Sequence, residues 1–265
     1  MSAELDHLHH LDAESARFRS VLNRAQPSAP VPTCPGWDAA DLLWHLTEVQ
    51  AFWSAIVRER CADPGELPGP VPSRPDSYAD LLELAETTAA ELSRVLAATP
   101  ASTGVWTWSD DRTAGFVRRR QAHEALIHRV DAECVTGQRT PLDAALAADG
   151  VDEALRVMFG ESPDWVQLDV DEHASIRVTS TDTGKHWLVR LARYQGTDEA
   201  GQEQAGSTVV VADQDHDLAT AATVSATAAD LDCWLWSRPP QGAVELAGDV
   251  QVLAGLRAVV AEGIQ

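Results

Sequence analysis

The sequence is poor in basic residues, and lysine is almost absent. Its 265 residues include 20 Lys and Arg against 41 Asp and Glu, which gives a formal net charge of -21. The one lysine is Lys185. Nucleic acids and anionic membrane surfaces bind to basic protein faces. We therefore expect no nucleic-acid or membrane partner and favour a small-molecule partner instead.

Motifs of several common enzyme classes are also missing. The chain has no Gly-x-Ser-x-Gly elbow, no Walker loop and no Gly-x-Gly-x-x-Gly run, which argues against serine hydrolases, P-loop enzymes and dinucleotide enzymes. Its four cysteines are far apart and form no Cys-x-x-Cys pair, so a cysteine zinc site is not expected. With no long apolar run and no recognisable signal peptide, we expect a cytoplasmic protein.

The N-terminal part of the chain carries four amphipathic segments with helical spacing. They cover residues 4–24, 38–56, 78–98 and 113–136. Loops rich in Pro, Gly or small polar residues separate them. Four helices of about 20 residues predict a four-helix bundle over residues 1–145.

The pattern changes after about residue 145. Alternating or β-branched runs predict strands at residues 165–170, 175–179, 187–192, 208–212, 222–226 and 244–246. Thr227 is expected to cap a short helix, and Asp249 a terminal one. Residues 146–265 are therefore predicted to form a smaller α+β domain, which makes the whole chain α+β.

The motif Glu124-Ala-Leu-Ile-His128 is the most informative one in the chain. A carboxylate and an imidazole four residues apart lie on the same face of a helix. Both groups bind Zn²⁺ and similar divalent ions. His45, on the apolar stripe of another predicted helix, could supply a third ligand. Three such ligands leave one coordination position open, as in catalytic metal sites.

Each part of this pattern also has a simpler explanation. Glu and His often meet at this spacing on helix surfaces, and a lone His on an apolar face is more often a buried, hydrogen-bonded residue. The coincidence of three ionisable groups on core-facing stripes favours the metal hypothesis, because such groups are costly in a bundle core unless paired or metal-bound. Asp131 could accept a hydrogen bond from an imidazole N–H beside the metal. It could instead pair with Arg129 or Arg120.

Three stretches of the chain together resemble a known family. Val31-Pro-Thr-Cys-Pro-Gly-Trp37, followed by Asp41-Leu-Leu-Trp-His45-Leu, resembles the N-terminal signature of the mycothiol-dependent maleylpyruvate isomerases. The run from His123 to Glu133 resembles their second signature. The stretches 229–238 and 244–249 are similar to the end of their C-terminal domain.

The resemblance implies a DinB-like metal-binding bundle in which His45, Glu124 and His128 hold zinc or another divalent metal. Many DinB-like proteins use three histidines instead. It also implies mycothiol, a low-molecular-weight thiol, as cosubstrate. The metal-activated thiolate would add to a small electrophile, in either a cis–trans isomerisation or a thiol transfer. Arg238, in the C-terminal domain, is the candidate for a catalytic arginine.

Three tryptophans, Trp37, Trp106 and Trp108, are candidates for substrate binding, although tryptophans are more often plain core residues. Two rival functions stay open. One is a non-catalytic small-molecule-binding or regulatory protein on the same fold. The other is a thiol-independent metallohydrolase that uses bound water as its nucleophile.

Overall fold

The computed structural model describes residues 5–67, 72–198, 200–212 and 220–263. The chain forms two compact units, residues 1–140 and residues 141–265. In the described part of the chain, no helix combines the length and the apolar character needed to cross a membrane.

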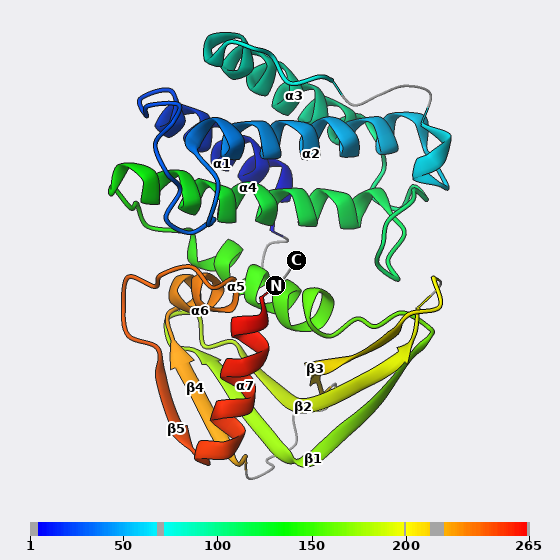
Figure 1. The fold of residues 1–265 in the computed structure, drawn as a ribbon, viewed down its shortest axis with the longest axis vertical. Helices are drawn as coiled ribbons and strands as arrows, with labels where there is room; N and C mark the ends of the chain where they lie inside the picture. The colour runs from blue at the N-terminus through cyan, green and yellow to red at the C-terminus, as the bar shows by residue number, and fades with distance from the viewer. Residues whose placement is uncertain (1–4, 68–71, 199, 213–219, 264–265) are drawn as a thin grey trace. The chain divides into compact units, whose positions relative to one another are not determined.

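The first unit is a helical bundle, as the sequence predicts (Figure 1). Its helices are α1 (His7–Leu22), α2 (Ala39–Glu59), α3 (Tyr78–Ala98) and α4 (Ala114–Thr136), with a short 3-10 helix at Pro64–Glu66. Helix α1 packs mainly against α4, and α2 packs mainly against α3. Leucines from α1, α2 and α3 are fully buried between them, which explains the apolar stripes in the sequence.

Tyr78, the first residue of α3, ties this helix to the end of α1. Its hydroxyl donates a hydrogen bond to the carbonyl oxygen of Leu22 at 2.9 Å. Burial, together with the nearby carboxylate of Asp38, raises the pKa of Tyr78 to about 12. The neutral phenol therefore stabilises the fold fully below pH 10, and this contribution is lost as the pH rises towards 12.

We expect Tyr78→Phe to remove both the hydrogen bond and this pH dependence. At pH 8 the variant should lose about 1 kcal/mol of unfolding free energy, because the carbonyl oxygen of Leu22 loses the hydrogen bond from Tyr78 and keeps the one from the Ala25 N–H. Between pH 10 and 11.5 its stability should fall less steeply than that of the wild type. Urea unfolding across this range measures both effects, and parallel curves for the two proteins would contradict the role given to Tyr78.

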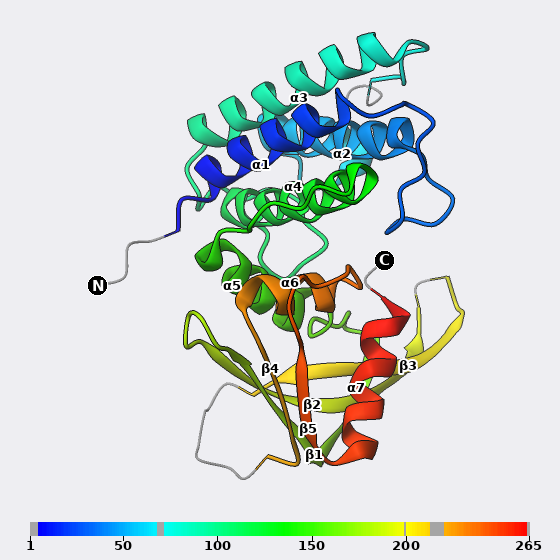
Figure 2. The same ribbon diagram turned by 90° about the vertical axis from the view of Figure 1, so that its left-hand side faces the viewer.

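The second unit is a five-stranded sheet with three helices (Figure 2). The helices are α5 (Ala144–Glu153), which continues into a π-helical turn at Ala154–Met158, α6 (Ala228–Leu235) and α7 (Val250–Glu262). The strands are β1 (Val166–Ser180), β2 (His186–Thr197), β3 (Glu203–Val211), β4 (Ala222–Ala226) and β5 (Glu245–Gly248). Their order is β3-β2-β1-β4-β5, in which β1 and β4 are parallel and the other pairs antiparallel.

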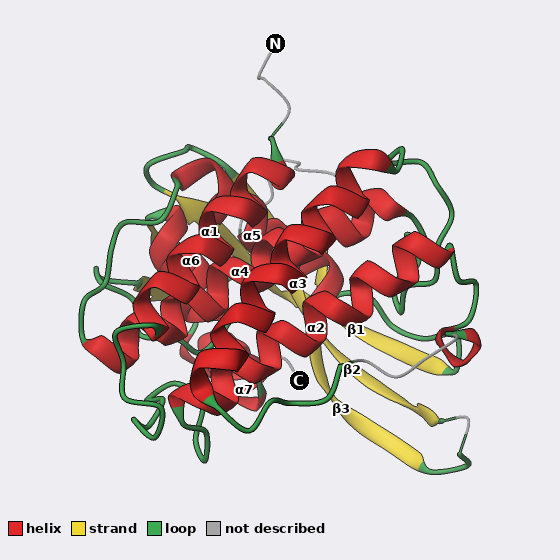
Figure 3. Cartoon of the chain, turned by 90° about the horizontal axis from the view of Figure 1, so that it is seen from above, coloured by secondary structure: helices red, strands yellow, loops and turns green. Residues whose placement is uncertain are grey.

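The core of this unit lies between the sheet and its helices. Apolar residues at alternate positions of β1, β2 and β4 pack against α5, α6 and α7, which matches the alternation in the sequence. Strands β1, β2 and β3 lie side by side (Figure 3). Helix α7 contacts all three of them and β5.

Three details differ from the sequence-based expectation. The strands predicted at 165–170 and 175–179 are one strand, β1, because an irregularity between Val170 and Ser175 lets its pairing with β2 continue. Strands β2 and β3 are longer than predicted, because their exposed polar ends pair with each other outside the hydrophobic pattern. Helix α5 is not anticipated by the sequence analysis.

Candidate metal centre

His45 is placed by a well-defined start of α2. The Asp38 side chain accepts a hydrogen bond from the Asp41 backbone N–H at 2.9 Å, and the Asp41 side chain accepts one from the Asp38 N–H at 3.1 Å. This reciprocal cap fixes the first turn of the helix. His45 follows one turn later, with 30% of its side chain exposed. The ring of Trp37, just before the cap, lies 4.9 Å from the His45 ring, centroid to centroid.

The other two predicted ligands come from α4, which runs beside α2 in the bundle (Figure 1). The side chain of Thr113 caps this helix, and Gly137, with φ of 69°, ends it. Glu124 and His128 are one turn apart, and the distance from His128 Nε2 to Glu124 Oε1 is 3.1 Å.

The three predicted ligands converge on one point. His45 Nε2 lies 3.4 Å from Glu124 Oε1, and the rings of His45 and His128 are 4.8 Å apart. One potential ligand atom from each residue lies within 4.8 Å of the other two. The four-residue spacing brings two of these groups together, and helix packing brings the third.

Two further residues contact this cluster through hydrogen bonds to His128 and Glu124. His128 Nδ1 lies 2.9 Å from Oδ2 of Asp131, a fully buried carboxylate. The sequence analysis expected such a contact, and the role of Asp131 beside a metal ion stays a prediction. Arg120, also buried, donates from Nη2 to Glu124 Oε2 at 3.2 Å. Sequence reasoning did not assign Arg120 to the site, although its position four residues before Glu124 is the signal that could have done so.

The charges in the cluster stabilise one another strongly. Burial by itself lowers the pKa of His128, but its hydrogen bonds with Asp131 and Glu124 outweigh burial and raise that pKa to about 9. Burial would raise the pKa of Glu124, yet its interactions with His128, His45 and Arg120 hold it well below its usual range. Glu124 is therefore ionised, and His128 beside it is protonated. A bound cation would take the place of the proton on His128.

The donor set and its spacing fit a divalent metal ion. Two imidazole nitrogens and one carboxylate oxygen are common zinc ligands. Tetrahedral ligands about 2.0–2.1 Å from zinc lie roughly 3.3 Å from one another. The 3.1 Å and 3.4 Å separations around Glu124 Oε1 are close to that value. With Asp131 bonded to Nδ1, the Nε2 atom of His128 is the one that faces the other two ligands.

The tryptophans predicted to bind substrate lie in different surroundings. Trp37 is next to His45. Trp106 stacks on Trp53, with ring centroids 5.8 Å apart. Trp108 is 47% exposed and packs edge-on against Phe116. Of the three, Trp37 is thus the one seen in contact with a predicted ligand, and a substrate role stays a prediction for all of them.

Arg238 belongs to the second unit and follows α6. Its Nη1 donates to the carbonyl oxygen of Trp236 at 2.8 Å, within its own loop. Ser237, the residue before it, has a positive φ of 57°, so this loop turns sharply. The catalytic role suggested for Arg238 stays a prediction.

Comparison with known proteins agrees with the resemblance seen in the motifs. The family model described as the mycothiol maleylpyruvate isomerase N-terminal domain matches residues 8–133. The model for the C-terminal domain of the same family matches residues 145–255. No curated protein sequence matches the chain.

Two solved structures share the fold. One is the crystal structure of the mycothiol-dependent maleylpyruvate isomerase, with 16% identity and a TM-score of 0.55. The other is a histidine-to-alanine mutant of a mycothiol-dependent maleylpyruvate isomerase, with 14% identity and a TM-score of 0.59. Each comparison covers 92% of this chain and 93% of the other. With both domain models in their expected order, this chain belongs to the mycothiol maleylpyruvate isomerase family.

Proposed function

We propose that the protein is a divalent-metal-dependent enzyme that uses mycothiol as its thiol cosubstrate and adds the thiolate to a small electrophile. The observation that carries the proposal is the convergence of His45, Glu124 and His128 within a family named for a mycothiol-dependent isomerase. Mycothiol dependence is taken from that name and from the relatives with the same fold.

His45, Glu124 and His128 would hold the metal, for which zinc is the first candidate. When bound, a divalent cation lowers the pKa of a coordinated thiol, so that the thiolate is available at neutral pH. Asp131 would accept the Nδ1 proton of His128 in a hydrogen bond, so that Nε2 is the nitrogen available to the metal. Arg120 holds one oxygen of Glu124 and leaves the other facing the two imidazoles.

The test is a turnover assay with two readouts. Purified protein is given mycothiol and maleylpyruvate, and then mycothiol with a series of other small electrophiles. Absorbance follows cis–trans isomerisation, while a thiol reagent follows the concentration of free thiol. Isomerisation without thiol loss identifies an isomerase, because the thiol is released again. Equal loss of thiol and electrophile identifies a transferase.

Two results would overturn the proposal. Hydrolytic turnover that persists without any thiol would identify the protein as a metallohydrolase. No turnover with any electrophile, combined with tight binding of mycothiol or substrate, would identify a non-catalytic binding protein.

Asp131 offers a separate prediction for this site. Asp131→Asn keeps the size of the side chain but removes the charge that fixes the His128 ring. Loss of such a partner commonly lowers metal affinity by about 10- to 100-fold. Competition with a chromophoric chelator measures the affinity. Asp12→Asn, which removes an exposed carboxylate from α1, is the matched control and should bind like the wild type. Equal affinities in both variants would contradict the role of Asp131.

A further inference from the structure

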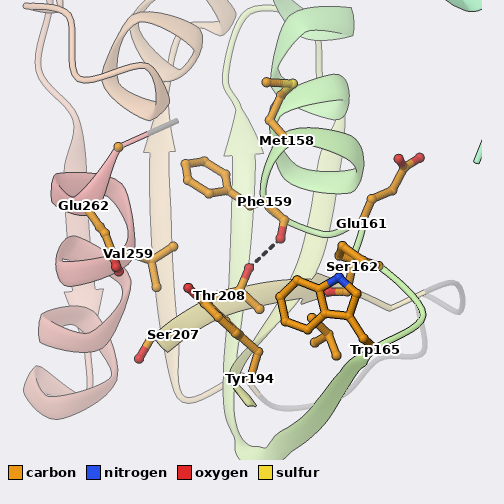
Figure 4. Close-up of a pocket in the computed structure, with 13 residues that line it drawn as sticks. Met158, Phe159, Glu161, Ser162, Trp165, Tyr194, Ser207, Thr208, Val259 and Glu262 are labelled. Atoms are coloured by element: carbon orange, nitrogen blue, oxygen red, sulfur yellow. Dashed lines mark hydrogen bonds between the residues drawn. The ribbon is translucent and has the colours of Figure 1, made fainter. Parts of the chain in front are cut away.

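The second unit contains a cavity of about 470 Å³, a size typical of small-molecule sites. The π-helical turn after α5, the start of β1, strands β2 and β3, and the C-terminal end of α7 all contribute to it (Figure 4). Single π-helical turns are rare and are often found at functional sites. The metal centre uses none of these elements.

Three aromatic residues, Phe159, Trp165 and Tyr194, form much of the wall (Figure 4). The rings of Tyr194 and Trp165 each pack against a glycine, Gly206 of β3 and Gly196 of β2. A Cβ atom on Gly206 would lie 2.6 Å from Cζ of Tyr194, and one on Gly196 would lie 2.8 Å from Cε3 of Trp165. Any larger residue at either glycine would push the ring away. The pairing of β2 with β1 and β3 therefore sets the positions of these two rings before a ligand binds.

The charged residues that line the cavity are both acidic. Glu161 and Glu262 both line it. Helix α7 ends at Glu262, and the π-helical turn ends at Met158, so two helix C-termini meet the cavity. A helix C-terminus carries a partial negative charge that favours cations. Among the described residues that line the cavity, none is Lys, Arg or His.

We propose that this cavity binds a small organic cation, namely a quaternary ammonium or protonated amine with an apolar body. The faces of Trp and Tyr attract such cations, and Glu262 with the two helix ends supplies the opposite charge. The apolar body would contact Phe159, Met158 and Val259. Anionic ligands are disfavoured, because none of the described lining residues carries a positive charge that would compensate theirs, so we do not expect carboxylate electrophiles here. The proposal does not depend on the metal centre.

The test uses benzyltrimethylammonium as the probe on the full-length protein. Benzyl alcohol and benzoate serve as neutral and anionic aromatic comparisons. Isothermal titration at low ionic strength should give an affinity for the cation at least tenfold higher than for the alcohol, and no binding of benzoate. Tyr194→Leu and Glu262→Gln should each weaken binding of the cation at least fivefold.

Glu245→Gln is the matched control, because it removes an exposed carboxylate of β5 outside the cavity. It should change the affinity less than twofold. Circular dichroism and thermal unfolding establish that each variant is folded. Two results would overturn the proposal: equal affinity for the cation and the alcohol, or equal weakening by Glu262→Gln and Glu245→Gln. Gly206→Ala should displace the Tyr194 ring and so abolish binding of the cation. Wild-type affinity in this variant would show that Tyr194 does not contact the ligand.

Discussion

Replacing His128 with alanine should lower thiol-dependent turnover by roughly a thousandfold, because a bound metal ion is worth several kcal/mol to catalysis. His128 supplies one of three converging donor atoms and is the proposed ligand whose ring contacts a buried carboxylate, that of Asp131. Without it, two donors from different helices are left, too few for a stable site. The assay is the same measurement of isomerisation and free thiol, at saturating mycothiol.

The fold should survive this change with a moderate loss. Asp131 loses a hydrogen-bond partner in a buried position, which costs about 1–3 kcal/mol. His9→Ala is the control, since His9 is an exposed histidine of α1 that belongs to neither group of potential metal ligands among the described residues. It should keep turnover within a few-fold of the wild type. Full activity in His128→Ala, or equal loss in both variants, would remove His128 from the mechanism.

The second large effect concerns a buried ionic network between α1 and α4. Arg129 Nη1 lies 2.8 Å from Glu14 Oε2, and the same guanidinium donates to the carbonyl and hydroxyl oxygens of Thr140 at 2.9 and 2.7 Å. Glu133, fully buried, accepts from Arg17 at 2.8 Å and from Thr140 at 2.6 Å. Three of these side chains, those of Glu14, Arg129 and Glu133, are almost inaccessible to solvent.

Arg129→Ala should destabilise the protein by about 3–5 kcal/mol, because it removes the guanidinium that pairs with the buried carboxylate of Glu14 at 2.8 Å and weakens the network around Glu133, which keeps Arg17. Chemical unfolding at neutral pH measures the loss. Arg94→Ala is the control: Arg94 pairs with Glu91 at 2.8 Å on the surface, where an ion pair is screened by solvent and contributes little to stability. A loss below 1 kcal/mol for Arg129→Ala would show that the network contributes no more than a surface pair.

The local features of the site follow from the sequence. The reciprocal cap at Asp38 and Asp41 and the four-residue spacing of Glu124 and His128 are short-range patterns, and the structure contains both. That His45 meets them depends on how α2 packs against α4. Spacing along one helix carries no information on that packing, so the sequence could offer His45 as a third ligand only from its apolar stripe and from the family resemblance, and the ligand assignment stays a prediction.

The features that the sequence did not reveal are of a different kind. Helix α5 has ten residues and is rich in alanine, and its buried face is built mainly from small residues, so it lacks the series of large apolar side chains that marks the longer helices of the bundle. The continuation of β1 through its irregularity depends on cross-strand pairing with β2. The cavity with Trp165 and Tyr194 depends on glycines that are far from these rings in sequence or separated from them by a turn. All three arise from tertiary contacts.

Metal content of the purified protein, measured by elemental analysis for wild type and His45→Ala, tests the central claim most directly. His45 is the proposed ligand that comes from a separate helix, so its loss probes the assembled site and not the α4 pair alone. We predict about one divalent ion per wild-type chain, as one three-ligand site requires, and less than about a tenth of that in the variant. No metal in either protein after supplementation with zinc, or equal metal in both, would contradict the account.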